Sequence, residues 1–288
     1  LATLTLTTSV YDHLHMDRES IVQRQEGFHK IDGYSVSSAR LQRIYARMAN
    51  IPNPDSCITD SVDTTRFSPG QIDSSNREKL TLGWVGNSQW GKSMKDDVKG
   101  YRRLFLPLIE KLAQNGLNVD SLVADPTHNH IPFADMPEYY RKIDILLCTS
   151  EMEGTPNPVL EAMATGLPVV STDVGIVAEA FGPLQSQFIV QNPTPDTFAE
   201  RVMLLNSDNS LRRSISEENL LVIQDWDSKI KVKDWWDFWL EAKQHSGDRR
   251  TSFRRKMLLT ANCNQYLAEQ LESTASFNPW RLFNPNRR

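Results

Sequence analysis

The sequence predicts an α/β protein built on a Rossmann-like parallel sheet, and three observations lead to this prediction. From residue 79 onward, short segments rich in Val, Ile and Leu alternate with helical patterns. These segments are apolar throughout, which is typical of strands that are covered on both faces. The chain has 288 residues, 39% of them hydrophobic, so it can form one large domain or two modest ones.

Five strands are expected in this sheet, and helices connect them. The strands are residues 80–85, 119–124, 143–150, 168–172 and 188–190. Apolar residues at helical spacing predict helices over 101–112, 138–142 and 157–165, and a helical region over 195–242. Ligands of such sheets bind beyond the carboxyl ends of the strands. Chemistry is therefore expected in the loops that follow Val85, Ala124, Ser150 and Thr172.

The residues before this sheet predict the remnant of a second Rossmann-like unit. β-Branched residues in near alternation indicate a strand over 1–10, and apolar spacing indicates a helix over 40–49 that Ser37 or Ser38 can cap. Residues 66–76 are polar and contain several turn formers, which is typical of a linker. The chain begins with Leu, already in a strand-like segment, so we expect it to start partway through this unit.

Three parts are expected in the chain, and the last is a basic tail. They are the remnant with its linker (1–76), the sheet domain (77–242) and the tail (243–288). The tail carries nine Lys and Arg against three Asp and Glu, whereas the remaining residues have a net charge of −10. An acidic body argues against binding of nucleic acid. The tail is either a solvated segment or one that contacts an anionic membrane surface or another chain.

Cysteine usage and hydropathy favour a cytoplasmic protein. The three cysteines, Cys57, Cys148 and Cys263, are far apart and unpatterned, so neither disulfides nor a metal site is predicted. No apolar run reaches 18 residues, which excludes a membrane-spanning helix, and no signal peptide is recognised. Peripheral contact with an anionic membrane through the basic tail is an additional expectation.

The helical region ends in an aromatic cluster that has two interpretations. Its members are Trp226, Trp235, Trp236, Phe238 and Trp239. Such a cluster packs a helix onto a domain or, less commonly, offers a platform for a sugar. We favour packing.

The strongest pattern is EGTPNPVLEAMATG (153–166), which directly follows a predicted strand. It indicates a tight loop and a helix, with Asn157 as N-cap and Pro158 in the first turn. Amides near the helix start would be free to bind an anion such as a diphosphate. These are the amides of Gly154, Thr155, Asn157, Val159 and Leu160. Glu153 at the loop entrance and Glu161, expected in the first turn, would bind neutral hydroxyls or merely complement the helix dipole.

With this motif the chain resembles the retaining glycosyltransferases of family 4, also described as glycosyl transferases group 1. The E-x7-E spacing of Glu153 and Glu161, followed by EAMATGLPVVSTDVG, is similar to the donor-binding motif of that family. The segments SVSSARL (35–41) and SVDTTRFSP (61–69) extend the resemblance, the latter with Ser61 in place of the usual Gly. The resemblance implies a GT-B fold of two Rossmann-like domains, with most of the N-terminal domain lacking here.

The resemblance also implies roles for individual residues. The first motif Glu contacts hydroxyls of the donor sugar, which falls on Glu153, and the second holds the nucleotide ribose, which falls on Glu161. Backbone amides between them hold the diphosphate. This sequence departs from the commoner EGFG form, with Thr155 and Pro156 in place of Phe and Gly. Pro156 has no amide hydrogen, so one donor is lost.

A basic pair, Arg-x4-Lys-Gly, neutralises the leaving diphosphate in this family and is altered here. Asn87, which follows Gly86 at the end of the first strand, stands in the place of the Arg. Lys92 has the expected spacing, but Lys99 precedes Gly100 and opens the next helix, seven residues later. We favour Lys99, with an insertion in the loop. The alternative is that the loop lysines are solvated charges.

His13 is the third catalytic candidate, beside Glu153 and Lys99. It follows the first predicted strand, and family members often carry a His in the N-terminal domain that faces the donor sugar. The alternative is a structural histidine.

The expected function is transfer of a sugar, with retention and without a metal ion or cofactor. The donor would be a nucleotide-diphospho-sugar, and the acceptor a hydroxyl of a glycan or of a lipid-linked molecule. A nucleotide-sugar 2-epimerase on the same fold and a non-catalytic nucleotide-sugar-binding subunit stay open as alternatives. Because most of the N-terminal domain is expected to be missing, the chain alone either catalyses transfer or only binds nucleotide.

Overall fold

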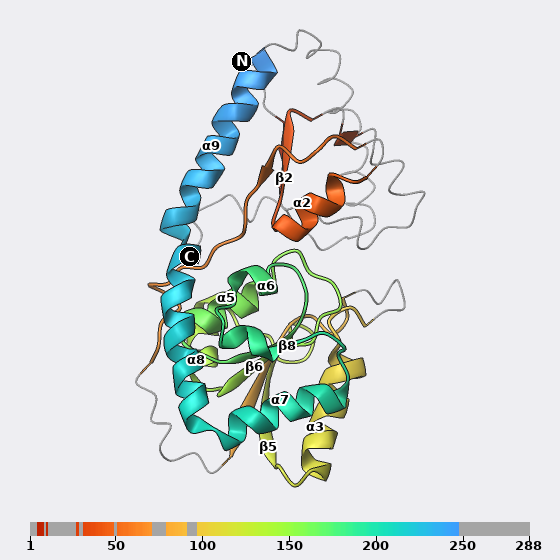
Figure 1. Ribbon diagram of the computed structural model, residues 1–288, viewed down its shortest axis with the longest axis vertical. Coiled ribbons are helices and arrows are strands. Elements are labelled where there is room, and N and C mark those ends of the chain that lie inside the picture. The colour runs from red at the N-terminus through yellow and green to blue at the C-terminus, as the bar shows by residue number, and fades with distance from the viewer. Residues whose placement is uncertain are drawn as a thin grey trace.

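The computed structural model describes residues 5–8, 10, 27–28, 31–48, 51–70, 79–90 and 97–247, which form two parallel sheets (Figure 1). The smaller sheet has the order β1-β2-β3, from β1 (Leu6–Thr7), β2 (Gly33–Val36) and β3 (Ser56–Cys57). The larger sheet has the order β5-β4-β6-β7-β8. Its strands are β4 (Leu80–Val85), β5 (Val119–Ala124), β6 (Ile145–Cys148), β7 (Val169–Thr172) and β8 (Ile189–Val190). The predicted α/β class with a parallel sheet is confirmed.

Two hydrophobic cores cover the two faces of the larger sheet, because side chains alternate along each strand. Along β6, Ile145 and Leu147 belong to one core, and Leu146 and Cys148 belong to the other. The first core is closed by α3 (Leu106–Gln114) and α7 (Pro195–Ser207), and the second by α4 (Met136–Arg141) and α5 (Asn157–Ala164). Further helices are α6 (Val177–Ala180) and α8 (Asn209–Val222).

The helix predicted over 101–112 begins in a different form. Tyr101–Phe105 is a π-helical turn, after which the chain continues as α3. Gly100, just before this turn, has a φ of 68°, a left-handed conformation that glycine adopts without strain. The π-helical turn therefore follows a position where any residue other than glycine would strain the backbone.

The N-terminal part is less regular than the sequence predicts. Of the strand expected over 1–10, only Leu6–Thr7 is a strand among the described residues. Helix α2 (Ala39–Tyr45) forms close to its predicted place. Of the two predicted caps, Ser38 is the one used, since its Oγ accepts from the amide of Leu41 at 3.1 Å.

The chain passes between the two sheets twice, and the two crossings are bonded to each other. The amide of Val62 donates to the carbonyl oxygen of Trp226 at 3.0 Å. The amide of Ser228 in turn donates to the carbonyl oxygen of Val62 at 2.9 Å. Helix α9 (Ser228–Gly247) then runs back alongside the smaller sheet (Figure 1). Its last five residues lie in the tail that is predicted to start at 243. Within the described part of the chain, no helix has the length and apolar character that crossing a bilayer requires.

The first residues of the predicted linker are packed against the larger sheet. Phe67 is only 2% exposed, and its ring lies 5.9 Å from that of Tyr140 between centroids. The guanidinium of Arg66 lies 4.1 Å from the centre of the Phe133 ring and donates to the Phe133 carbonyl oxygen at 2.9 Å. Residues 71–76 of the predicted linker lie outside the described residues.

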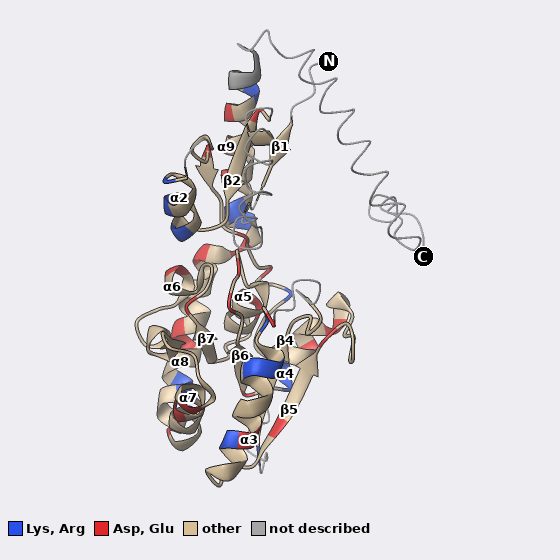
Figure 2. Cartoon of the chain, turned by 90° about the vertical axis from the view of Figure 1, so that its right-hand side faces the viewer, with Lys and Arg blue, Asp and Glu red and all other residues tan. Residues whose placement is uncertain are grey.

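Helix α2 also contacts the loops at the carboxyl edge of the larger sheet. The carboxylate of Glu179 in α6 accepts from the amides of Ala39 and Arg40 at 3.2 and 3.4 Å. The Arg40 side chain donates to the carbonyl oxygen of Asp173 at 2.9 Å and lies 3.4 Å from its carboxylate. Figure 2 shows α2 facing α6 across the space between the two sheets. These contacts hold α2 against the loop that follows β7.

Candidate active site

A cavity of about 370 Å³ lies at the carboxyl ends of β4 and β6. This is the place where parallel-sheet topology predicts a ligand. Six residues proposed from the sequence line it, namely Gly86, Asn87, Lys99, Glu153, Thr155 and Asn157. The fold therefore joins the loop after β4 and the motif after β6 in one site.

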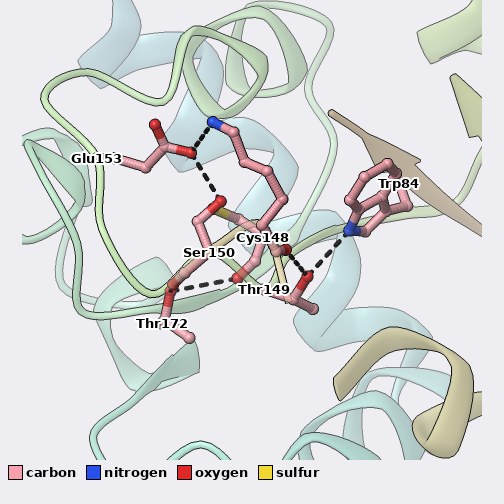
Figure 3. A network of polar contacts seen from close by, with 7 residues as sticks. Trp84, Cys148, Thr149, Ser150, Glu153 and Thr172 are labelled. Carbon is pink, nitrogen blue, oxygen red and sulfur yellow. Dashed lines mark hydrogen bonds and ion pairs between the residues drawn. The ribbon is translucent and has the colours of Figure 1, made fainter. Parts of the chain in front are cut away.

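An ion pair between Lys99 and Glu153 lies in this cavity. Lys99 Nζ donates to Glu153 Oε1 at 2.5 Å, and Ser150 Oγ donates to the same oxygen at 2.7 Å (Figure 3). The two charged side chains are 22% and 13% exposed, so both charges are largely withdrawn from bulk water. The pair thus places the predicted diphosphate-binding cation next to the predicted sugar-binding carboxylate.

The end of β6 positions Lys99 through its backbone. Trp84 Nε1 donates to Thr149 Oγ1 at 2.9 Å, and that hydroxyl donates to the carbonyl oxygen of Lys99 at 2.7 Å (Figure 3). The amide of Glu151 donates to the carbonyl oxygen of Val98 at 2.8 Å. These hydrogen bonds fix the backbone at Val98 and Lys99 without involving the Lys99 side chain.

Gly100 permits this close approach of the loop to β6. A Cβ at this position would lie 2.1 Å from the carbonyl oxygen of Thr149, too close for any side chain. This lack of space explains why a glycine follows Lys99. The ammonium of Lys99 also lies 5.7 Å from the centre of the Trp90 ring.

The start of α5 differs from the prediction. Pro156 is the N-cap and Asn157 is the first helical residue, so the prediction of Asn157 as N-cap is wrong. The reason is a tight turn in which the amide of Asn157 donates to the carbonyl oxygen of Thr155 at 3.0 Å. The amide of Val159 donates to the carbonyl oxygen of Pro156 at 2.8 Å. Two of the five amides expected to be free are therefore engaged within the motif itself.

Thr155 offers a hydroxyl close to Pro156, which has no amide hydrogen to donate. Its Oγ1 is buried and has no hydrogen-bond partner among the described residues, and the residue lines the cavity. A hydroxyl can both donate and accept. It can therefore replace the donor that Pro156 lacks.

Glu161 lies in the second turn of α5, so its predicted place in the first turn is wrong. It is also not among the residues that line the cavity. The shift follows from the helix starting at Asn157. Tyr140 Oη donates to Glu161 Oε2 at 2.7 Å. Burial raises the pKa of the Glu161 carboxyl to about 7, against the lowering effect of this bond and of the Arg66 charge. Glu161 thus changes its charge near neutral pH.

Replacing Glu161 by glutamine is expected to stabilise the fold at pH 8 but not at pH 4. The folded state binds this proton more tightly than the unfolded state, whose Glu has a pKa of about 4.5. The stability contributed by this proton is therefore complete below pH 4.5 and is lost as the pH rises through 7. The shift corresponds to about 3 kcal/mol at most. Urea unfolding of both proteins from pH 4 to 8 measures it, and parallel stability curves would contradict it.

Two predicted residues, His13 and Lys92, lie outside the described residues. Sequence reasoning missed three residues that hold the two glutamates and the lysine, namely Thr149, Ser150 and Tyr140. Thr149 and Ser150 could have been found, because they are polar residues at the end of an apolar strand. Nothing in the sequence near Tyr140 indicates its partner.

A smaller cavity of about 110 Å³ lies between α2 and the loops that follow β6 and β7. Arg40 and Asp173, which hold the two parts together, both line it. Met152 and Glu153 line both cavities. Groups bound in the two cavities can therefore meet near Glu153.

Part of the chain that forms this site matches a known protein family. Residues 126–220, which contain both motif glutamates, match the family model described as glycosyl transferases group 1. The lipopolysaccharide core biosynthesis mannosyltransferase LpsB of Rhizobium meliloti is 36% identical over 91 residues, which is 31% of this chain and 24% of that protein. The chain thus spans about a quarter of the length of this curated relative.

Solved structures share the fold over most of the chain. Anabaena Alr3699/HepE in complex with UDP and glucose has a TM-score of 0.65 at 13% identity, covering 82% of this chain and 71% of that one. Sucrose-phosphate synthase from Thermosynechococcus elongatus has a TM-score of 0.62 at 15% identity, covering 82% and 67%. A glycosyltransferase from Rickettsia africae has a TM-score of 0.61 at 14% identity, covering 82% and 70%.

The fold is that of the GT-B glycosyltransferases, as the motif resemblance implies. The part of the chain that carries Glu153 and Glu161 is the part that matches the glycosyl transferases group 1 model. Lys99 precedes the matched segment, and its contacts with Thr149 and Glu153 connect it to that segment.

Proposed function

We propose that the protein is a retaining glycosyltransferase that moves a sugar from a nucleotide-diphospho-sugar to an acceptor hydroxyl. The ion pair of Lys99 and Glu153 beside the start of α5 carries this proposal. A fixed cation and a helix N-terminus suit a departing diphosphate, and a carboxylate suits the hydroxyls of a sugar. The fold neighbour Alr3699/HepE, which has been solved in complex with UDP-glucose, supports a donor of this class.

Donor binding would exchange the partners of the ion pair. Lys99 would turn from Glu153 to the diphosphate, and the released carboxylate of Glu153 would accept hydrogen bonds from the sugar. The amide of Gly154 and the unpaired hydroxyl of Thr155 would add donors to the diphosphate or the sugar. Glu161, in its ionised form, would accept from the ribose hydroxyls. His13 keeps its proposed place facing the donor sugar.

In the transfer step, the bond between the anomeric carbon and a diphosphate oxygen breaks, and the acceptor oxygen bonds to the same face of that carbon. The acceptor proton passes to the departing diphosphate. Negative charge grows on the diphosphate as it leaves, so Lys99 stabilises the transition state more than the bound donor. Because Lys99 supplies this charge, the proposed mechanism uses neither a metal ion nor a cofactor.

The acceptor and the surroundings of the enzyme are further parts of this proposal. A glycan or a lipid-linked acceptor would approach through the smaller cavity, on the side of Glu153 that faces α2. The basic residues of 243–288 would favour an anionic membrane surface, where a lipid-linked acceptor is found.

Two alternatives use the same site without this reaction. A 2-epimerase would convert the nucleotide sugar without an acceptor. A non-catalytic subunit would bind the nucleotide sugar with no turnover, and the mutual neutralisation of Lys99 and Glu153 in the structure is compatible with that role.

A thermal-shift screen of nucleotide sugars, carried out in EDTA, tests the proposal. We expect at least one nucleotide-diphospho-sugar to raise the Tm, because a ligand that binds only the folded state stabilises it. Turnover of that donor with a glycan or lipid acceptor should also survive EDTA. No stabilisation by any nucleotide sugar would contradict the proposal. Loss of turnover that manganese restores would contradict the metal-independent mechanism.

A further inference from the structure

Helix α9 carries an apolar stripe on its exposed face. Val232, Trp236, Trp239 and Leu240 are spaced at i, i+4, i+7 and i+8, so they lie on one face of the helix. They are 60%, 58%, 48% and 41% exposed, and the two tryptophan rings pack edge to face at 6.5 Å. The opposite face packs inward through Phe238, which is 2% exposed. The packing interpretation of the aromatic cluster therefore holds for Phe238 but not for these two tryptophans.

Lysines border the apolar stripe. By helical spacing, Lys229, Lys233 and Lys243 share its face, and all three are exposed. Lys233 pairs with the carboxylate of Asp237, which lies one turn further along the helix. The chain then continues into residues 243–288, with nine Lys and Arg against three Asp and Glu.

We propose that the apolar stripe of α9 docks on an anionic lipid surface. Tryptophan combines an apolar ring with a polar N–H, and such side chains gather at the boundary between lipid and water. A helix with an apolar face bordered by lysines lies flat in that boundary and is attracted by anionic headgroups. This proposal extends the membrane contact proposed for residues 243–288 to α9, and it does not rest on glycosyl transfer.

The dimensions of the apolar stripe argue against a second copy of the chain as the occupant. From the exposed fractions, its four side chains offer roughly 400 Å², whereas a stable complex buries about 800 Å² on each partner. A lipid surface requires no such area, because insertion of a few aromatic side chains and charge attraction act together. The bordering lysines would also repel the same face of another copy.

Sedimentation of the full chain with vesicles tests the proposal. The vesicles contain phosphatidylglycerol and phosphatidylcholine in equal parts, or phosphatidylcholine alone. We expect binding to the anionic vesicles only, with weaker binding at high salt. The double variant Trp236→Ala, Trp239→Ala should lower the partition coefficient at least about tenfold, because two large apolar side chains are lost.

Ile230→Ala is the matched control, since Ile230 is 55% exposed on the same helix but outside the apolar stripe. It should bind vesicles like the parent, and circular dichroism should show that both variants fold. Equal partition of the two variants, absence of parent binding, or equal binding to phosphatidylcholine alone would overturn the proposal. The proposal would also be overturned if the parent forms a dimer and binds no vesicles while the double variant is a monomer.

Discussion

Alanine in place of Lys99 is expected to lower kcat by about 100- to 1000-fold, the loss seen when one preorganised donor is removed from a reacting centre. The reason is that, in the proposed mechanism, the ammonium faces the charge that grows on the leaving diphosphate, and the Lys99 side chain is only 22% exposed. The alanine change also leaves Glu153 without its cation. Lys99→Gln is therefore measured beside it, since an amide can still donate to Glu153 but carries no charge.

Lys111→Ala is the control for loss of a lysine, because Lys111 pairs with Asp196 at 2.5 Å on the outside of the larger sheet. Its kcat should equal that of the parent. Lys92→Ala tests the alternative that the motif spacing suggests. The diphosphate role of Lys99 is refuted if the glutamine variant keeps parental kcat, or if Lys92→Ala alone shows the large loss.

Glutamine in place of Glu153 is expected to lower kcat by about ten- to a hundredfold without weakening the binding of a nucleoside diphosphate. The loss corresponds to a charged hydrogen bond of about 1.5–3 kcal/mol to a sugar hydroxyl. Affinity for the diphosphate should hold or rise, because Lys99 no longer has a carboxylate partner in the free protein. Steady-state kinetics give kcat, and calorimetric titration gives the Kd.

The control for this change is Glu138→Gln, since Glu138 lies on α4, is 58% exposed and pairs with Arg141 and Lys142, none of which lines the cavity. It should leave both quantities unchanged. A Glu153→Gln variant with parental kcat, or with diphosphate affinity lowered as much as kcat, would show that Glu153 does not act on the sugar.

Local patterns in the sequence predicted the sheet well. The predicted limits 80–85 and 119–124 are those of β4 and β5, because each apolar run is bounded by residues that disfavour strands. Gly166, the last residue of the motif, has a φ of 77°, the left-handed conformation that glycine commonly adopts after a helix. These features depend on residues close together in the chain.

Contacts between distant segments could not be predicted in this way. Lys99 and Glu153 are 54 positions apart, and their contact arises only because β4 and β6 are neighbours in the sheet. The raised pKa of Glu161 arises from burial beside Tyr140, which no spacing reveals. The polar residues around Phe67 predict that it belongs to a linker, yet the larger sheet buries it.

The anchoring of Lys99 to the end of β6 makes its position independent of the length of the preceding loop. Hydrogen bonds from Thr149 and Glu151, and the lack of room for a Cβ at Gly100, fix the chain where the lysine begins. Residues can be added or removed upstream at little cost, since doubling a loop's length costs only about 0.6 kcal/mol. The lysine proposed to bind the diphosphate should therefore be located in homologous sequences by the glycine that follows it, not by counting from the strand that precedes it.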